Sequence, residues 1–230
     1  MNIAVILAGG SGSRIGSDTP KQFIEVNGKK VIEYSIEAFE HHPLIDEILI
    51  VCKSGYIDQL NNLVKKNRYQ KVVNVIAGGK ERYQSSICAM KACENDNDIL
   101  LFHDAARPLI SKRIIDDCLE AMTRYDAVTV AVDTTDTIYI SDQTGHIVDI
   151  PMRKTLKNAQ TPQCFRRFVI HKAYLKALQD TAFMPTDDCS VVHKYLPDTR
   201  IHMVMGDTTN IKITYPEDID FFKKLLNQNS

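Results

Sequence analysis

The sequence lacks the features that would assign it to several broad classes of protein. Its 28 basic and 29 acidic side chains give a net charge of −1, without the basic excess typical of nucleic-acid-binding proteins. No uncharged apolar run approaches the roughly 18 residues that a membrane-spanning helix requires. The first residues carry no basic segment, and residues 3–7 are predicted to form a strand, not part of a signal peptide. We therefore expect a cytoplasmic protein that binds neither nucleic acid nor a membrane.

Cysteine and histidine patterns typical of metal sites and redox centres are also missing. The six cysteines include no CxxC pair, and the seven histidines include no HExxH motif or Cys/His cluster. A zinc site built from protein ligands is therefore not expected, and the sequence identifies no ligands for any other metal. In a chain of this length without a signal peptide, the cysteines are expected to be reduced, partly buried thiols.

The apolar residues predict the fold class. Short runs rich in valine, isoleucine and leucine alternate with amphipathic segments of helical period, in a chain of 230 residues that is 44% hydrophobic. This alternation predicts an α/β fold with a doubly wound, mostly parallel sheet covered by helices on both faces, a Rossmann-like arrangement. Strands are predicted at residues 3–7, 47–52, 72–76, 98–102, 127–132, 201–205 and 211–214. Helices are predicted at residues 31–39, 56–66, 81–93, 112–124, 166–178, 186–195 and 216–226.

The pattern changes near residue 134. Two short predicted strands, residues 137–140 and 146–150, flank the turn sequence DQTG and indicate a hairpin. The sequence leaves open whether this hairpin is an arm that reaches a second subunit or a simple excursion at the sheet edge. We expect a single domain over residues 1–230 with a β-arm at about 134–157, and a homodimer formed through that arm.

A glycine-rich loop follows the first predicted strand, where open α/β sheets bind ligands. Residues 7–22 read LAGGSGSRIGSDTPKQ, and the glycines allow backbone N–H groups to approach an anion closely. Arg14 and Lys21 add a guanidinium and an ammonium group, which suits a polyphosphate; the alternative is a tight turn with two solvated cations. Gly16 is not followed by Lys and Ser/Thr, which excludes a Walker A loop, and Ile15 breaks the GxGxxG pattern of dinucleotide-dependent oxidoreductases.

Other polar segments allow a structural or a functional interpretation. Residues 103–108 (HDAARP) could bind ribose or phosphate, or Asp104 and Arg107 could form an internal ion pair, with His103 as a structural hydrogen-bonding residue. Lys212 lies in an apolar predicted strand and needs an anionic partner if it is buried. Thr186 could be an ordinary helix N-cap.

The loop pattern L-A-G-G-x-G-x-R-x-G-x(3)-P-K-Q resembles the signature of nucleotidyltransferases that activate sugar and polyol phosphates. The segment Pro-Lys-Gln-Phe resembles their CTP-dependent cytidylyltransferase branch, and further motifs extend the similarity over nearly the whole chain. These motifs are GGKERYQS, HDAARP, DT, IPMR, AQTPQ, TDD and NIKIT. The resemblance implies a nucleotidyltransferase fold and an enzyme that converts CTP and a polyol phosphate to a CDP-polyol and pyrophosphate.

The resemblance also implies roles for the residues that match the motifs. The nucleotide would be bound by Ala8, Gly9, Gly10, Gly12, Gly79, Ser85 and Asp104. The catalytic cations would be Arg14, Lys21 and Lys212. The polyol phosphate would be bound by Arg107, Thr137, Arg153, Thr161 and Thr186. Mg²⁺ or another divalent cation is expected to bridge the phosphates, held more by the nucleotide than by the protein.

The identity of the polyol depends on a few residues. Methylerythritol enzymes usually carry a TxxR-type segment before TPQ, whereas IPMR at residues 150–153 resembles the ribitol-phosphate enzymes, as does TDDCS at residues 186–190. We therefore expect ribitol 5-phosphate, with 2-C-methyl-D-erythritol 4-phosphate of isoprenoid biosynthesis as the alternative. A non-catalytic nucleotide-binding module is a remote alternative, opposed by the intact set of basic residues.

Overall fold

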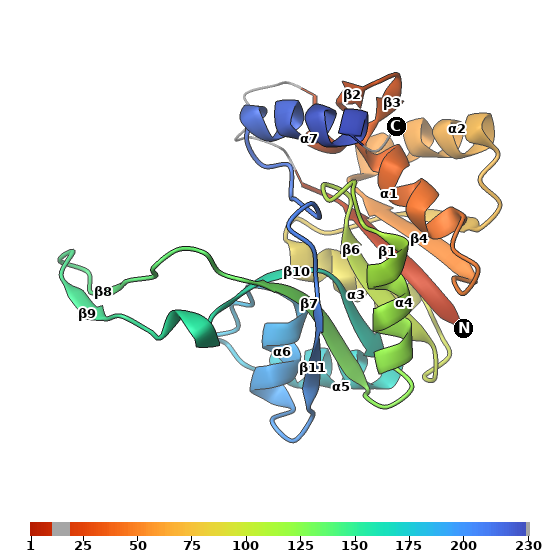
Figure 1. The fold of residues 1–230 in the computed structure, drawn as a ribbon. Helices are drawn as coiled ribbons and strands as arrows, with labels where there is room; N and C mark the ends of the chain where they lie inside the picture. The colour runs from red at the N-terminus through yellow and green to blue at the C-terminus, as the bar shows by residue number, and fades with distance from the viewer. Residues whose placement is uncertain (11–18, 229–230) are drawn as a thin grey trace.

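The computed structural model describes residues 1–10 and 19–228. Its centre is a seven-stranded sheet of order β11-β7-β10-β6-β1-β4-β5 (Figure 1). The strands are β1 (Asn2–Ala8), β4 (Glu47–Cys52), β5 (Val72–Ala77), β6 (Ile99–Asp104), β7 (Ala127–Asp133), β10 (Lys157–Arg166) and β11 (Ile201–Met205). The strands β6, β1, β4 and β5 are parallel, as are β7 and β11, whereas β10 runs antiparallel to both of its neighbours. The predicted α/β class with a mostly parallel sheet is confirmed.

Helices pack on both faces of this sheet. One layer consists of α1 (Val31–Glu40), α2 (Ile57–Asn67) and α4 (Lys112–Ala121). The other consists of α3 (Arg82–Ala92), α5 (Arg167–Ala177) and α6 (Asp188–Tyr195). Because side chains alternate along a strand, Ala4 and Ile6 of β1 pack in the first layer, while Val5 and Leu7 pack in the second. Among the described residues, no helix combines the length and apolar character that crossing a membrane would need.

The sequence pattern did not predict strand β10, which lies in the middle of the sheet. Its residues KNAQTPQCFR include Pro162, which has no N–H to donate to a neighbouring strand. The pairing of β10 with β7 shifts register between Ala159 and Gln163, and this irregularity accommodates the proline. The TPQ motif is therefore part of a buried strand that supports the site.

The strand predicted over residues 211–214 is wrong. Within residues 19–228 this segment joins no sheet. Instead, the Ile213 N–H donates to the carbonyl of Ala106 at 2.8 Å, and the Ile213 side chain packs against Phe222 of α7 (Pro216–Gln228). The alternation that suggested a strand thus comes from one isoleucine buried beneath α7 beside the polar Lys212.

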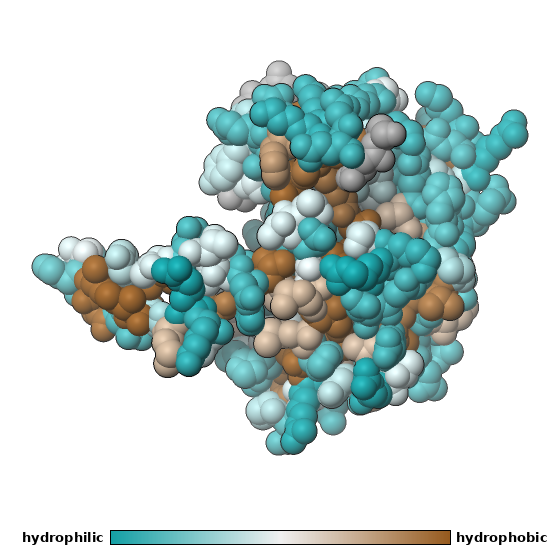
Figure 2. Space-filling view, viewed as in Figure 1, coloured by the Kyte–Doolittle hydropathy of each residue, from teal (hydrophilic) through white to brown (hydrophobic). Residues whose placement is uncertain are grey.

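A hairpin projects from the sheet between β7 and β10 (Figure 1). Its strands, β8 (Ile140–Ser141) and β9 (Ile147–Asp149), are shorter than predicted. In the turn, Asp142 Oδ1 accepts hydrogen bonds from the Thr144 and His146 N–H groups at 2.9 and 3.0 Å. Brown hydrophobic patches are visible on the arm in Figure 2. The large hydrophobic side chains that the arm exposes are Ile138, Tyr139, Ile140, Ile147, Val148, Ile150 and Met152.

A smaller hairpin and the state of the cysteines complete the description of the fold. A short hairpin of β2 (Glu25–Val26) and β3 (Lys29–Lys30) follows the turn η2 (Lys21–Phe23). All six cysteines are free thiols, as expected, and burial raises the pKa of both Cys52 and Cys93 to about 11.

Candidate active site

A pocket of about 340 Å³ opens at the carboxyl ends of β1 and β6. It brings together eight of the residues predicted for the nucleotide and the catalytic cations: Ala8, Gly9, Gly10, Lys21, Gly79, Ser85, Asp104 and Lys212. These residues come from five separate segments, and the parallel strands place their ends at one edge of the sheet. Predicted residues Gly12 and Arg14 lie outside the described residues.

The PKQ motif connects the glycine-rich loop to the C-terminal part of the chain. Lys21 in η2 lies in the pocket wall, 9% exposed, and its Nζ donates to the carbonyl of Ile213 at 2.6 Å. Gln22 Nε2 donates to the carbonyls of Ala8 and Gly10, at 2.7 and 3.1 Å. Gln22 therefore holds the end of β1 and the start of the loop together, a role that the sequence pattern did not predict.

Close packing explains the paired glycines before α3. A Cβ on Gly78 would lie 2.4 Å from Ser85 Oγ, and one on Gly79 would lie 2.2 Å from the Gln84 Cβ. The turn therefore packs directly against the first residues of α3, with Ser85 buried at the pocket wall. This geometry allows a ligand to contact both the glycine backbone and the Ser85 hydroxyl.

A charged network forms the other wall of the pocket. Lys212 Nζ lies 2.6 Å from Asp104 Oδ2, so the lysine has an anionic partner although its side chain is 40% exposed and not buried as a strand position would make it. Arg82 Nε lies 3.4 Å from Asp104 Oδ1, and its Nη1 lies 2.5 Å from Asp188 Oδ2. Although burial alone would raise the pKa of Asp104, Arg82 and Lys212 hold it well below its ordinary value. Asp104 is therefore ionised at neutral pH.

Asp104 does not form the internal ion pair with Arg107 that the sequence left open. Arg107 lies outside the pocket lining, and its guanidinium donates to the carbonyls of Asn210 and Ala159 at 2.7 and 3.3 Å. It thereby fastens the segment before Lys212 to β10.

Thr161 is buried beneath the pocket. Its Oγ1 accepts a hydrogen bond from the Asp104 N–H at 3.2 Å and lies 3.0 Å from His103 Nδ1. His103 Nε2 lies 3.0 Å from the Arg107 carbonyl, so Nε2 donates there and Nδ1 accepts from the Thr161 hydroxyl. Burial lowers the pKa of His103 to about 4, which keeps the ring neutral. The structural role expected for His103 is confirmed.

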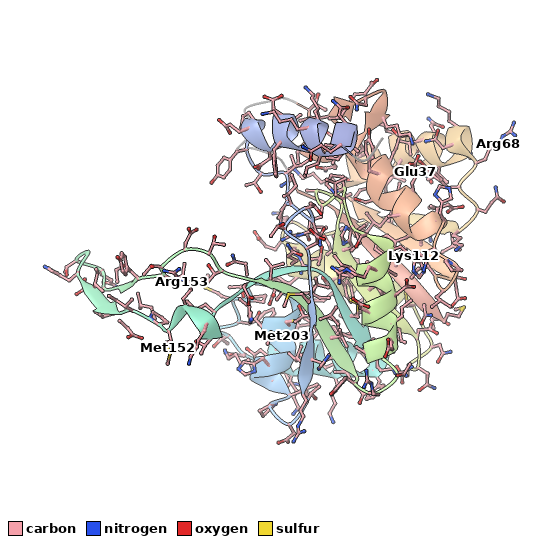
Figure 3. All side chains as sticks on the ribbon, viewed as in Figure 1. Glu37, Arg68, Lys112, Met152, Arg153 and Met203 are labelled. Carbon is pink, nitrogen blue, oxygen red and sulfur yellow. The ribbon has the colours of Figure 1, made fainter. Side chains whose placement is uncertain are left out.

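The remaining predicted residues lie away from the pocket. Arg153, labelled in Figure 3, lies on the projecting arm, and its Nη2 donates to Thr137 Oγ1 at 3.0 Å, which joins the two segments that flank the hairpin of β8 and β9. Thr186 is exposed in the loop before α6 and is not the N-cap. That role falls to Asp187, whose Oδ1 accepts from the Ser190 N–H at 2.7 Å. The arm pair and Thr186 thus lie outside the lining of the pocket in this chain.

The sequence pattern did not single out Arg82 and Asp188. Asp188 is fully buried and accepts from Arg82 and from the Tyr174 hydroxyl, which lies 2.6 Å from Oδ1. A cation in the first turn of a helix opposes the helix dipole, and this was the one local signal at Arg82. Its pairing with Asp188 spans 106 residues, so no local pattern could reveal it.

The described residues offer no cluster of three or more His, Cys, Asp or Glu side chains that could hold a metal ion. The pocket carboxylate Asp104 is already paired with two cations. The described residues therefore do not fit a resident magnesium site built from protein ligands.

Comparisons with known proteins show which family the whole chain matches. The family model for 2-C-methyl-D-erythritol 4-phosphate cytidylyltransferase, IspD, matches residues 2–228. The chain is 41% identical over 229 residues to 2-C-methyl-D-erythritol 4-phosphate cytidylyltransferase of Thermobifida fusca, covering 97% of this chain and 92% of that protein. It is also 40% identical to a bifunctional ribulose 5-phosphate reductase/CDP-ribitol pyrophosphorylase of Haemophilus influenzae, covering 100% of this chain and 49% of that protein.

A solved structure extends the agreement to three dimensions. The 4-diphosphocytidyl-2C-methyl-D-erythritol synthase of Anaerococcus prevotii superposes with a TM-score of 0.87 at 31% identity, covering 98% of each chain. The fold and the basic pocket at the strand ends define a nucleotidyltransferase. Within that class, the chain belongs to the IspD family of cytidylyltransferases. The predicted enzyme class and family are confirmed.

Proposed function

We propose that this enzyme transfers the cytidylyl group of CTP to 2-C-methyl-D-erythritol 4-phosphate, releasing pyrophosphate. The observation that carries this proposal is the match of the IspD family model to residues 2–228, supported by relatives named for that substrate. The comparisons favour this substrate, which the sequence motifs left as the alternative, over the expected ribitol 5-phosphate.

The pocket supports a reaction that depends on positioning and charge. A phosphate oxygen of the polyol attacks the α-phosphorus of CTP, and the bond from that phosphorus to the pyrophosphate oxygen breaks. The second pKa of a phosphomonoester is about 6, so the nucleophile is ionised at neutral pH and needs no general base. Lys21 and Lys212 are both anchored at the pocket wall, by the Ile213 carbonyl and by Asp104. Such preorganised cations stabilise charge on the transferring phosphoryl group.

The backbone and hydroxyl groups that line the pocket suggest how the nucleotide would bind. The cytosine would lie against Gly79 and Ser85, and the ends of β1 and of the glycine-rich loop would contact the nucleotide through Ala8 and Gly9. Mg²⁺ would enter bound to the triphosphate as part of the substrate.

The arm completes the proposal. We propose that Thr137 and Arg153 bind the polyol phosphate in the pocket of a second copy of this chain, forming a homodimer. Two observations support this arrangement: the arm leads away from the sheet (Figure 1), and it exposes seven large apolar side chains. A guanidinium beside a hydroxyl, 3.0 Å apart, suits a phosphomonoester.

Ribitol 5-phosphate remains the second candidate because of the arm sequence. Residues 150–153 (IPMR) have the pattern expected for ribitol-phosphate enzymes, and the Haemophilus influenzae relative is named for CDP-ribitol. This segment ends at Arg153, the residue proposed to bind the polyol phosphate.

Pyrophosphate release from CTP and Mg²⁺ tests the proposal, with the two polyol phosphates in parallel reactions. We expect release with 2-C-methyl-D-erythritol 4-phosphate. Release with ribitol 5-phosphate alone would overturn the proposed substrate and support the second candidate. Silence with both would contradict each of them.

A further inference from the structure

A buried charge network links the nucleotide pocket to the start of α6. Asp188, the first residue of α6, is 0% exposed and makes two short contacts through its carboxylate. Oδ2 accepts from Arg82 Nη1 at 2.5 Å, and Oδ1 accepts from the Tyr174 hydroxyl at 2.6 Å. The Asp188 N–H donates to Gln163 Oε1 of the central strand β10 at 3.2 Å. The carboxylate is therefore held by α3 and α5, and the backbone of the same residue is held by β10.

Arg82 shares its guanidinium between two carboxylates. It binds Asp188 at 2.5 Å but approaches Asp104 only to 3.4 Å, whereas Lys212 approaches Asp104 to 2.6 Å. Arg82, Asp104 and Lys212 line the pocket, and Asp188 does not. Asp188 thus contacts the pocket through Arg82.

Removing the charge of Asp188 would change which cation binds Asp104. A buried guanidinium that loses one carboxylate moves toward the nearest remaining one, because an uncompensated charge is costly in the interior. For Arg82 that carboxylate is Asp104, where Lys212 is now the closer partner. Arg82 faces Oδ1 of Asp104 and Lys212 binds Oδ2, so a closer Arg82 would compete with Lys212 for the charge of one carboxylate and weaken the anchor of Lys212 at the pocket wall.

We propose that Asp188, supported by the Tyr174 hydroxyl, is a positioning residue that keeps Arg82 from competing with Lys212 for Asp104. The inference rests on the proposed function, since it assigns Lys212 to the reacting phosphates. Because Lys212 acts on charge that develops during transfer, the effect falls on kcat and leaves the KM for CTP nearly unchanged.

The test uses Asp188→Asn, which keeps the shape of the side chain and removes its charge. With the polyol phosphate that the wild type accepts, we expect kcat per correctly folded chain to fall about tenfold, on the scale of a misplaced catalytic group. The KM for CTP should change less than about threefold. Tyr174→Phe, which removes one hydrogen bond to Asp188, should lower kcat in the same direction by a smaller factor.

A matched control exists on the surface. Asp180 also accepts from a tyrosine hydroxyl and a cation, Tyr195 at 2.6 Å and Lys194 Nζ at 2.9 Å, but it lies outside the pocket. Asp180→Asn should leave kcat at the wild-type value. Equal losses of kcat in Asp180→Asn and Asp188→Asn would show a general effect on folding and overturn the proposal.

A double variant separates positioning from structural support. With Arg82→Gln as background, Asp188→Asn should lower kcat no further, because the residue that it restrains is gone. Additive losses, or a wild-type kcat in Asp188→Asn, would overturn the inference while leaving the proposed function intact. An inactive wild type would instead contradict the proposed function, and this inference with it.

Discussion

At the residue scale, Lys21 is the most direct test of the chemistry. Its ammonium group is held in the pocket wall by the Ile213 carbonyl, so it needs little reorganisation to stabilise a transferring phosphoryl group. We expect Lys21→Ala to lower turnover at least about a hundredfold, the scale of losing one preorganised charge donor. Steady-state pyrophosphate release measures this. As a control, Lys29→Ala removes an exposed lysine paired with Glu37 and should keep wild-type turnover. Near-normal turnover of Lys21→Ala would refute the assignment of Lys21 to the transferring phosphoryl group.

His103 makes stability depend on pH. Its pKa of about 4 in the folded chain lies below the ordinary value of 6.5, so the unfolded chain binds more protons between these values. The free energy of unfolding should therefore fall as pH decreases from 6.5 to 4, by about 3 kcal/mol from this residue. Urea unfolding across this range should show a weaker pH dependence for His103→Gln than for the wild type. The exposed His193→Gln should retain the wild-type slope, and an unchanged slope in His103→Gln would contradict the prediction.

The residue scale also shows what the sequence could reveal of the site. Lys21, Ser85, Asp104 and Lys212 belong to motifs with a recognisable pattern, and the structure brings all four to one pocket. The sequence pattern could not reveal the partners of these residues. Hydrogen bonds between distant segments decide that Arg107 faces backbone carbonyls and that Asp104 binds Lys212 instead.

At the element scale, a strand could be predicted from the sequence where its residues are apolar, and it was missed where they are polar. The strands β1, β4 and β7 are buried on both faces, so their sequences are nearly continuous apolar runs that can be recognised without a structure. Strand β10 is equally buried in its middle but carries Gln160, Thr161 and Gln163, whose polar groups bond to neighbouring loops and side chains. Tertiary hydrogen bonds, invisible in the local pattern, make this polar segment a strand.

The arm yields a prediction at the same scale. Ile147 and Val148 are 55% and 60% exposed and are adjacent on β9, so their side chains point to opposite faces of the hairpin. If the arm packs on a second copy, one or both of Ile147→Asp and Val148→Asp should place an unpaired charge in the buried interface. The dissociation constant of the dimer should then rise by about tenfold or more. Sedimentation velocity over a concentration series measures this. Val73→Asp, on an exposed valine of the edge strand β5, is the control, and three indistinguishable profiles would contradict the arm interface.

At the scale of the whole molecule, the pocket and the contacts predicted on the arm lie in two separate places. The pocket lies at the carboxyl ends of β1 and β6, while Thr137 and Arg153 lie on an arm that leaves the sheet (Figures 1 and 3). One chain alone therefore does not present both sets at one surface. A closed pair of copies related by two-fold symmetry would present two complete sites, each with one pocket and the partner's arm.

Mixing two defective variants tests this division of the site. Lys21→Ala disables the pocket and Arg153→Ala disables the arm, so each homodimer should be nearly inactive. If arms serve the partner's pocket, a mixed dimer has one site with both defects and one site with neither. Random exchange at equal amounts then restores about a quarter of the wild-type sites, because half of the dimers are mixed. Pyrophosphate release after refolding the two variants together measures this recovery.

The control mixture combines the double variant Lys21→Ala, Arg153→Ala with Lys21→Ala. It contains no intact pocket and should stay inactive. An arm that serves its own pocket would leave every site in the first mixture with one defect, and activity would not return.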